Sequence, residues 1–382
     1  MVQILDTTLR EGEQTPGVYF PIEAKIAIAK QLDKVGVNII EAGHPLVSSS
    51  IHEAVSKVAK LDINAIVGAH SRSLKKDVDL ALECGVSFLG IFYCVSDERL
   101  NEVFKKDLTN AISQITEVIC YAKQQNPDLI IRYTPEDTVR SKFENVVTAS
   151  VEAVKAGADI ISVADTTGYM IPRMKGRSMY DFVSKLKSEL NTKNVHPKIA
   201  VHCHNDLGFA ISNAIEGFEA GAEIIDASVM GLGERAGIVD LATLLAVLAS
   251  GFNITNGWNL KELNELYRKV SKYSKTFIPV TAPVMGENAF THCAGVHTHA
   301  ATINPFHYQN LDPALFGREM KISLDHMSGV AAVKYALNKL GEEKPDKALI
   351  DLVRSRARYC GEAGRTMDEE YLKDIVDAYH SK

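Results

Sequence analysis

The segment KIAVHCHND, residues 198–206, has the form that decides the fold of this chain. It begins with apolar, β-favouring residues and ends in polar ones, so a short buried strand would deliver polar side chains at its carboxyl end. The other runs of this form are VQILDTT (2–8), NIIEAGHP (38–45), NAIVGAH (64–70), FLGIFYC (88–94), LIIRYTPED (129–137), IISVADT (160–166) and EIIDASVMGLG (223–233).

Segments of helical length separate these runs. IEAKIAIAKQLDKVG (22–36) and VVTASVEAVKAG (146–157) carry apolar residues at helical spacing and end in glycine, as helices commonly do. Eight strand–helix alternations within about 250 residues predict an α/β fold, a (β/α)8 TIM barrel. An open dinucleotide-binding sheet would need G-x-G-x-x-G after the first strand, and LREGEQTPG (9–17) does not supply it.

Polar side chains gather at the predicted carboxyl ends of six strands. They are Asp6 to Glu11, His44, His70, Arg132 with Glu136, Asp165 with Thr166, and His202 with His204. Barrel enzymes assemble their active sites at this face, so the pattern predicts an enzyme.

The composition excludes several other classes of protein. The 382 residues are 46% hydrophobic and carry a net charge of −6, which does not indicate a nucleic-acid groove or a basic membrane patch. No apolar run approaches the roughly 20 residues that span a bilayer. The six cysteines are scattered without a C-x-x-C pair, which favours a reducing compartment. We therefore expect a cytoplasmic protein that binds neither nucleic acid nor membrane.

The two histidines of the HCHND stretch predict a metal site. Alternate residues of a strand point the same way, so His202 and His204 share one face. Glu11, at the exit of the first strand, would supply a carboxylate at the same rim. Two imidazoles and one carboxylate suit Zn²⁺, Mn²⁺ or a similar divalent cation with positions left open for substrate. Asn205 and Asp206 would either orient the imidazoles or cap the following helix.

Three ordered motifs resemble one enzyme family. LDTTLREGEQTPGV (5–18) resembles the D-x-T-L-R-[DE]-G-x-Q signature of the acyl-CoA-condensing barrels, which include the 2-isopropylmalate, citramalate and homocitrate synthases. VHCHNDLG (201–208) and GLGERAG (231–237) are similar to that family's second and third signatures. The resemblance implies that acetyl-CoA condenses with a 2-oxo acid and that the CoA thioester is then hydrolysed. It also implies a divalent metal (Zn, Mn or Mg) held by Glu11, His202 and His204. Isopropylmalate synthases often add an asparagine where this chain has Ile238.

The resemblance also implies roles for other residues. Arg10 would stabilise the alkoxide that develops on the keto oxygen. Thr166 would hydrogen-bond the substrate carboxylate, and Gln14 would add a substrate contact. Glu136 and His297 would carry out the acid/base chemistry. Family members also use a tyrosine beyond that histidine, and Tyr308 is a candidate for it here.

The resemblance implies a domain order and a homodimer. Residues 1–255 would form the catalytic barrel, and residues 256–324 a linking subdomain that contributes to the partner's active site. Residues 325–382 would form a small helical subdomain, with no leucine-type regulatory domain. His297 would then complete the site in trans.

The motifs divide over the identity of the 2-oxo acid. EAGHP (41–45), TPGV (15–18) and DTTGY (165–169) look more like isopropylmalate synthases, whereas HSRS (70–73) and IRYTPEDTVRS (131–141) resemble homocitrate synthases. His70 and Arg132 would suit the second carboxylate of 2-oxoglutarate, which favours homocitrate synthase. Gly90 counts against this reading, because an acidic partner for His70 would be expected there. Isopropylmalate and citramalate synthases remain the alternatives.

Two other functional classes fit the sequence less well. Acyl-CoA lyases and aldolases on the same barrel tend to carry a Gly-Gly-Cys loop after strand eight, where this chain has GLGERAG. A catalytically inactive regulator would be expected to have lost Arg10 or a metal ligand, and none is missing.

Overall fold

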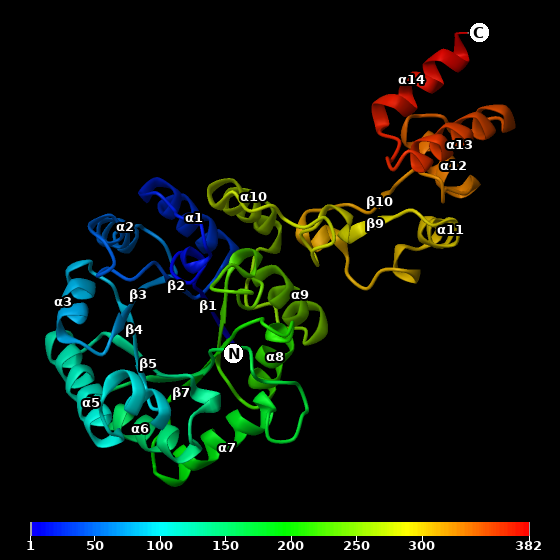
Figure 1. The fold of residues 1–382 in the computed structure, drawn as a ribbon. Coiled ribbons are helices and arrows are strands. Elements are labelled where there is room, and N and C mark those ends of the chain that lie inside the picture. The colour runs from blue at the N-terminus through cyan, green and yellow to red at the C-terminus, as the bar shows by residue number, and fades with distance from the viewer. Residues whose placement is uncertain (1, 382) are drawn as a thin grey trace. The chain divides into compact units, whose positions relative to one another are not determined.

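The structure is a computed structural model that describes residues 2–381. The chain divides into two compact units, Met1–Phe277 and Ile278–Lys382. In the first unit, eight parallel strands close into a barrel in sequence order, with β8 paired to β1 (Figure 1). The strands are β1 (Gln3–Asp6), β2 (Ile39–Glu41), β3 (Ile66–Arg72), β4 (Phe88–Cys94), β5 (Ile130–Glu136), β6 (Ile160–Asp165), β7 (Lys198–Cys203) and β8 (Ile224–Ala227). The predicted TIM barrel is confirmed.

Helices between the strands form a ring outside the barrel (Figure 1). They are α1 (Ile22–Val35), α2 (Ser49–Ala59), α3 (Lys75–Glu83), α5 (Leu108–Gln125), α6 (Phe143–Lys155), α7 (Met179–Thr192), α8 (Ala210–Glu219) and α9 (Leu241–Gly251). Local sequence sets their ends: Ser48 and Asp107 accept hydrogen bonds at the starts of α2 and α5, and Gly36 ends α1 at φ 94°. Between β4 and α5, the short α4 (Asp97–Arg99) runs into the π-helix η2 (Leu100–Phe104).

The first unit ends with α10 (Leu263–Ser274), which packs on α1. Its inward side chains Leu263, Leu266, Tyr267 and Val270 are buried. The Tyr267 hydroxyl donates a 2.5 Å hydrogen bond to Asp240, the residue that caps α9. These contacts explain why the compact unit extends to residue 277.

The second unit is mostly helical. Its helices are α11 (Gly295–Ile303), α12 (Val330–Lys339), α13 (Lys347–Glu362) and α14 (Glu369–His380), and its short strands are β9 (Thr291–His292) and β10 (Lys321–Ile322). A small core of its own, which includes Val333, Leu337 and Val353, holds the last three helices together.

The barrel interior begins with an apolar layer. Six strands each contribute one side chain that is at most 3% exposed: Leu5, Ile39, Phe88, Ile160, Ala200 and Ile224. This layer fills the barrel, so anything bound inside must enter from the end that lies above it.

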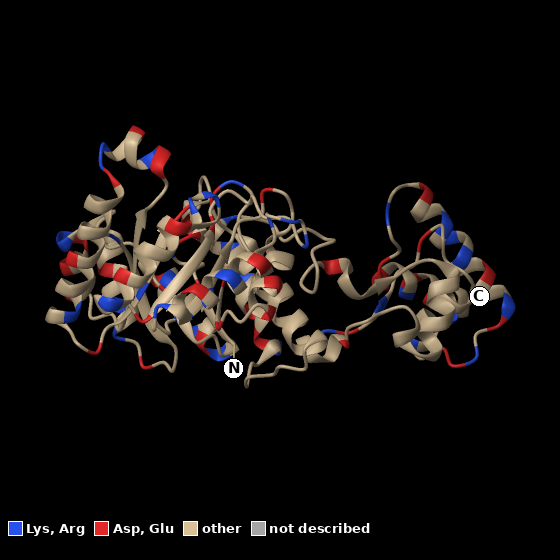
Figure 2. Cartoon of the chain, turned by 90° about the horizontal axis from the view of Figure 1, so that it is seen from below, with Lys and Arg blue, Asp and Glu red and all other residues tan. Residues whose placement is uncertain are grey.

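Basic and acidic residues both occur along the helices of the two units (Figure 2). Within residues 2–381, no helix combines the length and apolar character needed to cross a membrane.

Candidate active site

Above the apolar layer, the inward-facing positions of the barrel become polar. Successive inward residues of a strand are two positions apart, so the next inward residue on each strand lies nearer the carboxyl end. On five strands this residue is polar and buried: Glu41, Arg132, Ser162, His202 and Asp226. The apolar layer thus forms the floor of a polar site.

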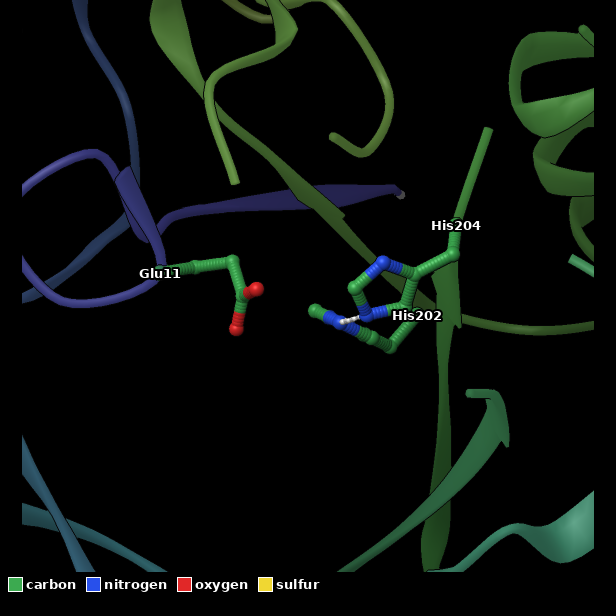
Figure 3. Close-up of side chains that lie close together, drawn as sticks. All are labelled: Glu11, His202 and His204. Carbon is green, nitrogen blue, oxygen red and sulfur yellow. Dashed lines mark hydrogen bonds between the residues drawn. The ribbon is translucent and has the colours of Figure 1, made fainter. Parts of the chain in front are cut away.

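Glu11, His202 and His204 lie together above this floor. Each offers one potential ligand atom, and these atoms lie within 4.8 Å of one another. Figure 3 shows the Glu11 carboxylate directed toward the two rings, whose Nε2 atoms are 3.3 Å apart. Burial, together with the neighbouring His202, lowers the pKa of His204 to about 4, so this ring is neutral at physiological pH. Two imidazoles and a carboxylate are a donor set that fits a divalent cation.

Asp226 orients one of these histidines. Its Oδ2 lies 3.0 Å from Nδ1 of His202. A carboxylate only accepts hydrogen bonds, so Nδ1 carries the proton and Nε2 presents its lone pair to the Glu11 side of the cavity. The sequence left the roles of Asn205 and Asp206 open. In the structure, Asn205 accepts a hydrogen bond from the backbone amide of Ala210, the first residue of α8, and Asp206 pairs with Arg235.

The loop after β1 is held from below by one buried lysine. Nζ of Lys25 donates to the carbonyl oxygens of Leu9 and Ala42 at 2.6 and 3.0 Å, and to the Glu13 carboxylate at 2.6 Å. These bonds tie the loop to the end of β2 and so fix the position of Arg10 and Glu11.

The loop after β8 closes over Glu11. The Glu234 amide donates to Oε1 of Glu11 at 3.2 Å, and a Cβ at Gly233 would lie only 3.2 Å from Cγ of Glu11. Burial raises the pKa of Glu11, but the adjoining Arg10 and the two histidines outweigh it, so the pKa lies below its ordinary value. Ile238 lies beside His204 and has no ligand atom, so this position adds no fourth protein ligand.

The Glu41 carboxylate contacts several polar and charged side chains of the site. Its carboxylate accepts hydrogen bonds from Thr7 at 2.8 Å and from Nε of Arg10 at 2.6 Å. It also lies 3.1 Å from Nδ1 of His70 and accepts a 3.1 Å bond from Nη2 of Arg132. Burial raises the pKa of this carboxyl, but Arg10, His70 and Arg132 outweigh it and hold the pKa well below its ordinary range.

Arg132 lies between two buried carboxylates. Nη1 donates to both oxygens of Asp226, at 3.0 and 2.8 Å, and Nη2 donates to Glu41. Its Nε atom is buried and has no partner in the described part of the chain. The charge of this guanidinium is therefore already balanced within the protein.

The acidic partner of His70 comes from β2, whereas it was expected at position 90 of β4, where this chain has glycine. Its Nδ1 faces Glu41, and its ring stacks on Phe92 with centroids 4.8 Å apart. Burial and then the nearby Arg10 lower its pKa to about 4. A Cβ at Gly90 would lie 3.1 Å from both the Glu41 carboxylate and the His70 ring, so the glycine leaves the space that this pair occupies. Glu41 of β2 therefore takes the place of the acidic partner that was expected at position 90.

A single cavity of about 240 Å³ collects the predicted residues of the barrel. Its lining includes Arg10, Glu11, Gln14, His70, Arg132, Glu136, Thr166, His202 and His204. Glu136 forms a 3.0 Å ion pair with Arg99 of α4. The Thr166 hydroxyl accepts from the Asp137 amide at 2.9 Å, which leaves its own proton to donate.

His297, the remaining predicted residue, lies on α11 of the second unit. Its ring lies against that of Tyr308, with centroids 4.3 Å apart. Both side chains are exposed within this chain.

The sequence patterns did not predict Glu41, Asp226 and Thr134, which all line or adjoin the cavity. Glu41 and Asp226 are single acids inside apolar runs, IIE and IID, and that interruption was the available signal. Thr134 lies between Arg132 and Glu136 on the same face of β5, and its buried hydroxyl has no partner among the residues described.

Comparison with known proteins gives matches along most of the chain. Residues 1–270 match the HMGL-like family model, and residues 284–364 match the model described as homocitrate synthase post-HMGL domain-like. A homocitrate synthase of Pyrococcus horikoshii is 43% identical over 92% of this chain and 94% of its own length. A 2-isopropylmalate synthase of Methanocaldococcus jannaschii is 35% identical over 98% of this chain and 71% of its own length.

Among solved structures, an HMG-CoA lyase of Bacillus subtilis aligns with a TM-score of 0.61 at 21% identity. It covers 73% of this chain and 95% of the lyase, and at this identity the likeness concerns the fold alone. The family-model matches, and the 43% identity to a synthase over most of both chains, show the family as well as the fold. This chain belongs to the HMGL-like family and, within it, to the acyl-CoA-condensing transferases of the homocitrate and 2-isopropylmalate synthase type.

Proposed function

We propose that this chain is a metal-dependent homocitrate synthase. It joins the methyl carbon of acetyl-CoA to the keto carbon of 2-oxoglutarate, and water then cleaves the thioester to release homocitrate and CoA. One observation carries the choice of substrate: the end of the cavity near His70 is polar, with Glu41, Arg132 and His44 around the imidazole. The isopropyl group of 2-oxoisovalerate would cover Nε2 of His70 and the hydroxyl of Thr134 without giving either of them a hydrogen bond.

Glu11, His202 and His204 would hold the cation. A bound divalent ion would polarise the keto group of the 2-oxo acid as a Lewis acid. Arg10 adjoins Glu11 through an ion pair, and its Nε is held by Glu41. That anchoring places a guanidinium beside the developing alkoxide without any need for it to reorganise during the reaction.

Three further residues would act on the substrates. Thr166 donates its hydroxyl proton to the carboxylate beside the keto group, and Gln14 adds a contact from the loop after β1. Glu136 lies at the cavity rim, and we propose that its carboxylate removes a proton from the acetyl methyl group. Its ion pair with Arg99 positions the carboxylate from the α4 side.

His297 would complete the acid/base chemistry from the second subunit of a homodimer. Support comes from the family resemblance and from the exposure of both His297 and Tyr308 within one chain. Mixing His202→Ala with His297→Ala protein after partial denaturation tests this arrangement. Completion in trans restores about one quarter of wild-type activity, because half of the dimers are mixed and each has one intact site. Completion within one chain restores none.

The substrate is tested by release of CoA. Protein loaded with Mn²⁺ or Mg²⁺ is given acetyl-CoA and, separately, 2-oxoglutarate, 2-oxoisovalerate or pyruvate, and free CoA is read with a thiol reagent. Cys120 and Cys293 are exposed, so a blank without 2-oxo acid must be subtracted. Release with 2-oxoglutarate is expected, whereas release only with 2-oxoisovalerate or pyruvate would assign the chain to one of the sister synthases. Cleavage of homocitryl-CoA to acetyl-CoA without net synthesis would indicate a lyase.

A further inference from the structure

His70 presents two chemically different nitrogens. Nδ1 lies 3.1 Å from a carboxylate oxygen of Glu41, and the ring is among the residues that line the cavity. Within residues 2–381, no hydrogen bond reaches the other nitrogen, Nε2. The ring cannot turn freely, because it is stacked on Phe92 with an interplanar angle of 12°.

Glu41 decides which of these nitrogens carries the proton. Its carboxylate is wholly buried and faces the guanidinium groups of Arg10 and Arg132, so it is ionised and can only accept hydrogen bonds. Nδ1 of His70 must therefore be the donor. In a neutral imidazole the second nitrogen is then a bare lone pair, so Nε2 is an acceptor.

A substrate carboxylate is also an acceptor and cannot bind to a bare lone pair. We propose, on the basis of the proposed function, that His70 takes up one proton when the distal carboxylate of 2-oxoglutarate binds, and that Glu41 enforces this uptake. The resulting imidazolium donates from Nδ1 to Glu41 and from Nε2 to the substrate. Substrate binding and proton binding are thereby linked at one residue.

The other charged groups around His70 are already paired and are not free to balance a substrate carboxylate. Arg132 from β5 is already engaged by Glu41 and Asp226, and Arg10 by Glu11 and Glu41. His44, in the loop after β2, has its Nε2 3.2 Å from Asp77, which also holds Arg72. From β4, Gly90 and Phe92 bring no charge. A new buried anion therefore lacks a free cation unless His70 becomes one.

The linkage has a definite sign. Before substrate binds, burial and the nearby Arg10 keep the pKa of His70 near 4, and a carboxylate at Nε2 raises it. Between the lower and the higher pKa, one proton enters with each substrate, and affinity falls about tenfold for each unit that the pH rises. A 2-oxo acid with an uncharged side chain requires no such proton.

Calorimetry measures this uptake directly. Metal-loaded protein is titrated with 2-oxoglutarate at one pH near 6 in buffers of different ionisation enthalpy, and the slope of observed heat against that enthalpy gives the protons bound. We expect about one proton per site for the wild type. His70→Gln can donate an amide N–H without charging, so its uptake should fall to about zero while binding weakens. The matched control is His44→Gln, which should keep an uptake of about one.

Glu41→Gln tests the enforcing residue. A glutamine amide at this position can donate to Nδ1, so the neutral ring can place its proton on Nε2 and bind the carboxylate with uptake near zero. If this variant fails to fold, as judged by circular dichroism, the comparison of His70→Gln with His44→Gln still decides.

Two results would overturn the proposal while leaving the proposed function intact: wild-type protein that binds 2-oxoglutarate without proton uptake, or His70→Gln with wild-type uptake. A protein that condenses another 2-oxo acid and gives no heat with 2-oxoglutarate would overturn the substrate assignment and this inference together.

Discussion

Gly90 offers a sharp test of the packing around Glu41 and His70. It lies on β4 with an ordinary backbone conformation, so alanine can adopt the same φ and ψ. In Gly90→Ala, however, the new Cβ would lie 3.1 Å from Oε1 of Glu41, 3.1 Å from Nδ1 of His70 and 3.4 Å from Nη2 of Arg132. The first two distances are too short for comfortable contact, and all three neighbours are held by hydrogen bonds.

The expected magnitude follows from two opposing effects. Overpacking a rigid interior costs about 1–3 kcal/mol. Replacing glycine by alanine also lowers the conformational entropy of the unfolded chain, which stabilises the folded state by about 0.4–1 kcal/mol. We therefore expect Gly90→Ala to lower the free energy of unfolding by about 1–2 kcal/mol, with a fall in melting temperature of about 2–8 °C. Displacement of His70 should also raise KM for the 2-oxo acid about tenfold, with little change for acetyl-CoA.

The fluorescence of Trp258, the chain's single tryptophan, reports on the barrel unit during unfolding. Gly251→Ala is the matched control: it ends α9, and its nearest neighbouring atom is Cγ1 of Val247 at 4.0 Å. This substitution should leave stability unchanged or raise it by up to about 1 kcal/mol. If Gly90→Ala were as stable as Gly251→Ala and kept wild-type KM, the close packing of Glu41 and His70 described above would be refuted.

Three further outcomes are expected. His202→Ala should abolish binding of Mn²⁺ followed by electron paramagnetic resonance, and retained binding would contradict the proposed ligand set. Glu136→Gln should lower kcat about 10²–10⁴-fold with little change in KM, because an amide cannot accept the methyl proton; near-wild-type kcat would remove Glu136 from that role. Burial raises the pKa of Asp6 from 3.8 to about 7, so the folded chain keeps a proton that the unfolded chain releases between these values. Stability therefore falls as pH rises through that window, by up to about 1.4 kcal/mol per unit, and urea unfolding should show a shallower fall for Asp6→Asn.

The parts of the site that were predictable rest on local patterns. A strand that ends in His202-x-His204 places both rings on one face whatever the rest of the fold does. The alternation of strands and helices then specifies a barrel, and in a barrel every strand end opens on one rim, which brings Glu11 to these histidines. The order of residues within each strand, together with the closure of the barrel, was therefore enough to predict the candidate metal site.

The electrostatic state of the substrate end was not predictable in the same way. His70 and Arg132 read as two cationic partners for a carboxylate, but in the structure Arg132 is balanced by Glu41 and Asp226, and His70 is neutral until it gains a proton. Glu41 and Asp226 come from strands 2 and 8. No sequence spacing indicates that they converge on a residue of strand 5.

The sequence by itself therefore determined the barrel, the family and the side chains that gather at its carboxyl rim, because strand periodicity and strand-end chemistry are local properties. Only the tertiary structure decided how those side chains are charged and which of them is still available to substrate. Charge and hydrogen-bond partners depend on distances of about 3 Å between residues far apart in the chain, and burial decides how strongly each pair acts. Gly90 shows the difference most plainly: in the sequence it is a missing acid, and in the fold it is the space that the acid from β2 requires.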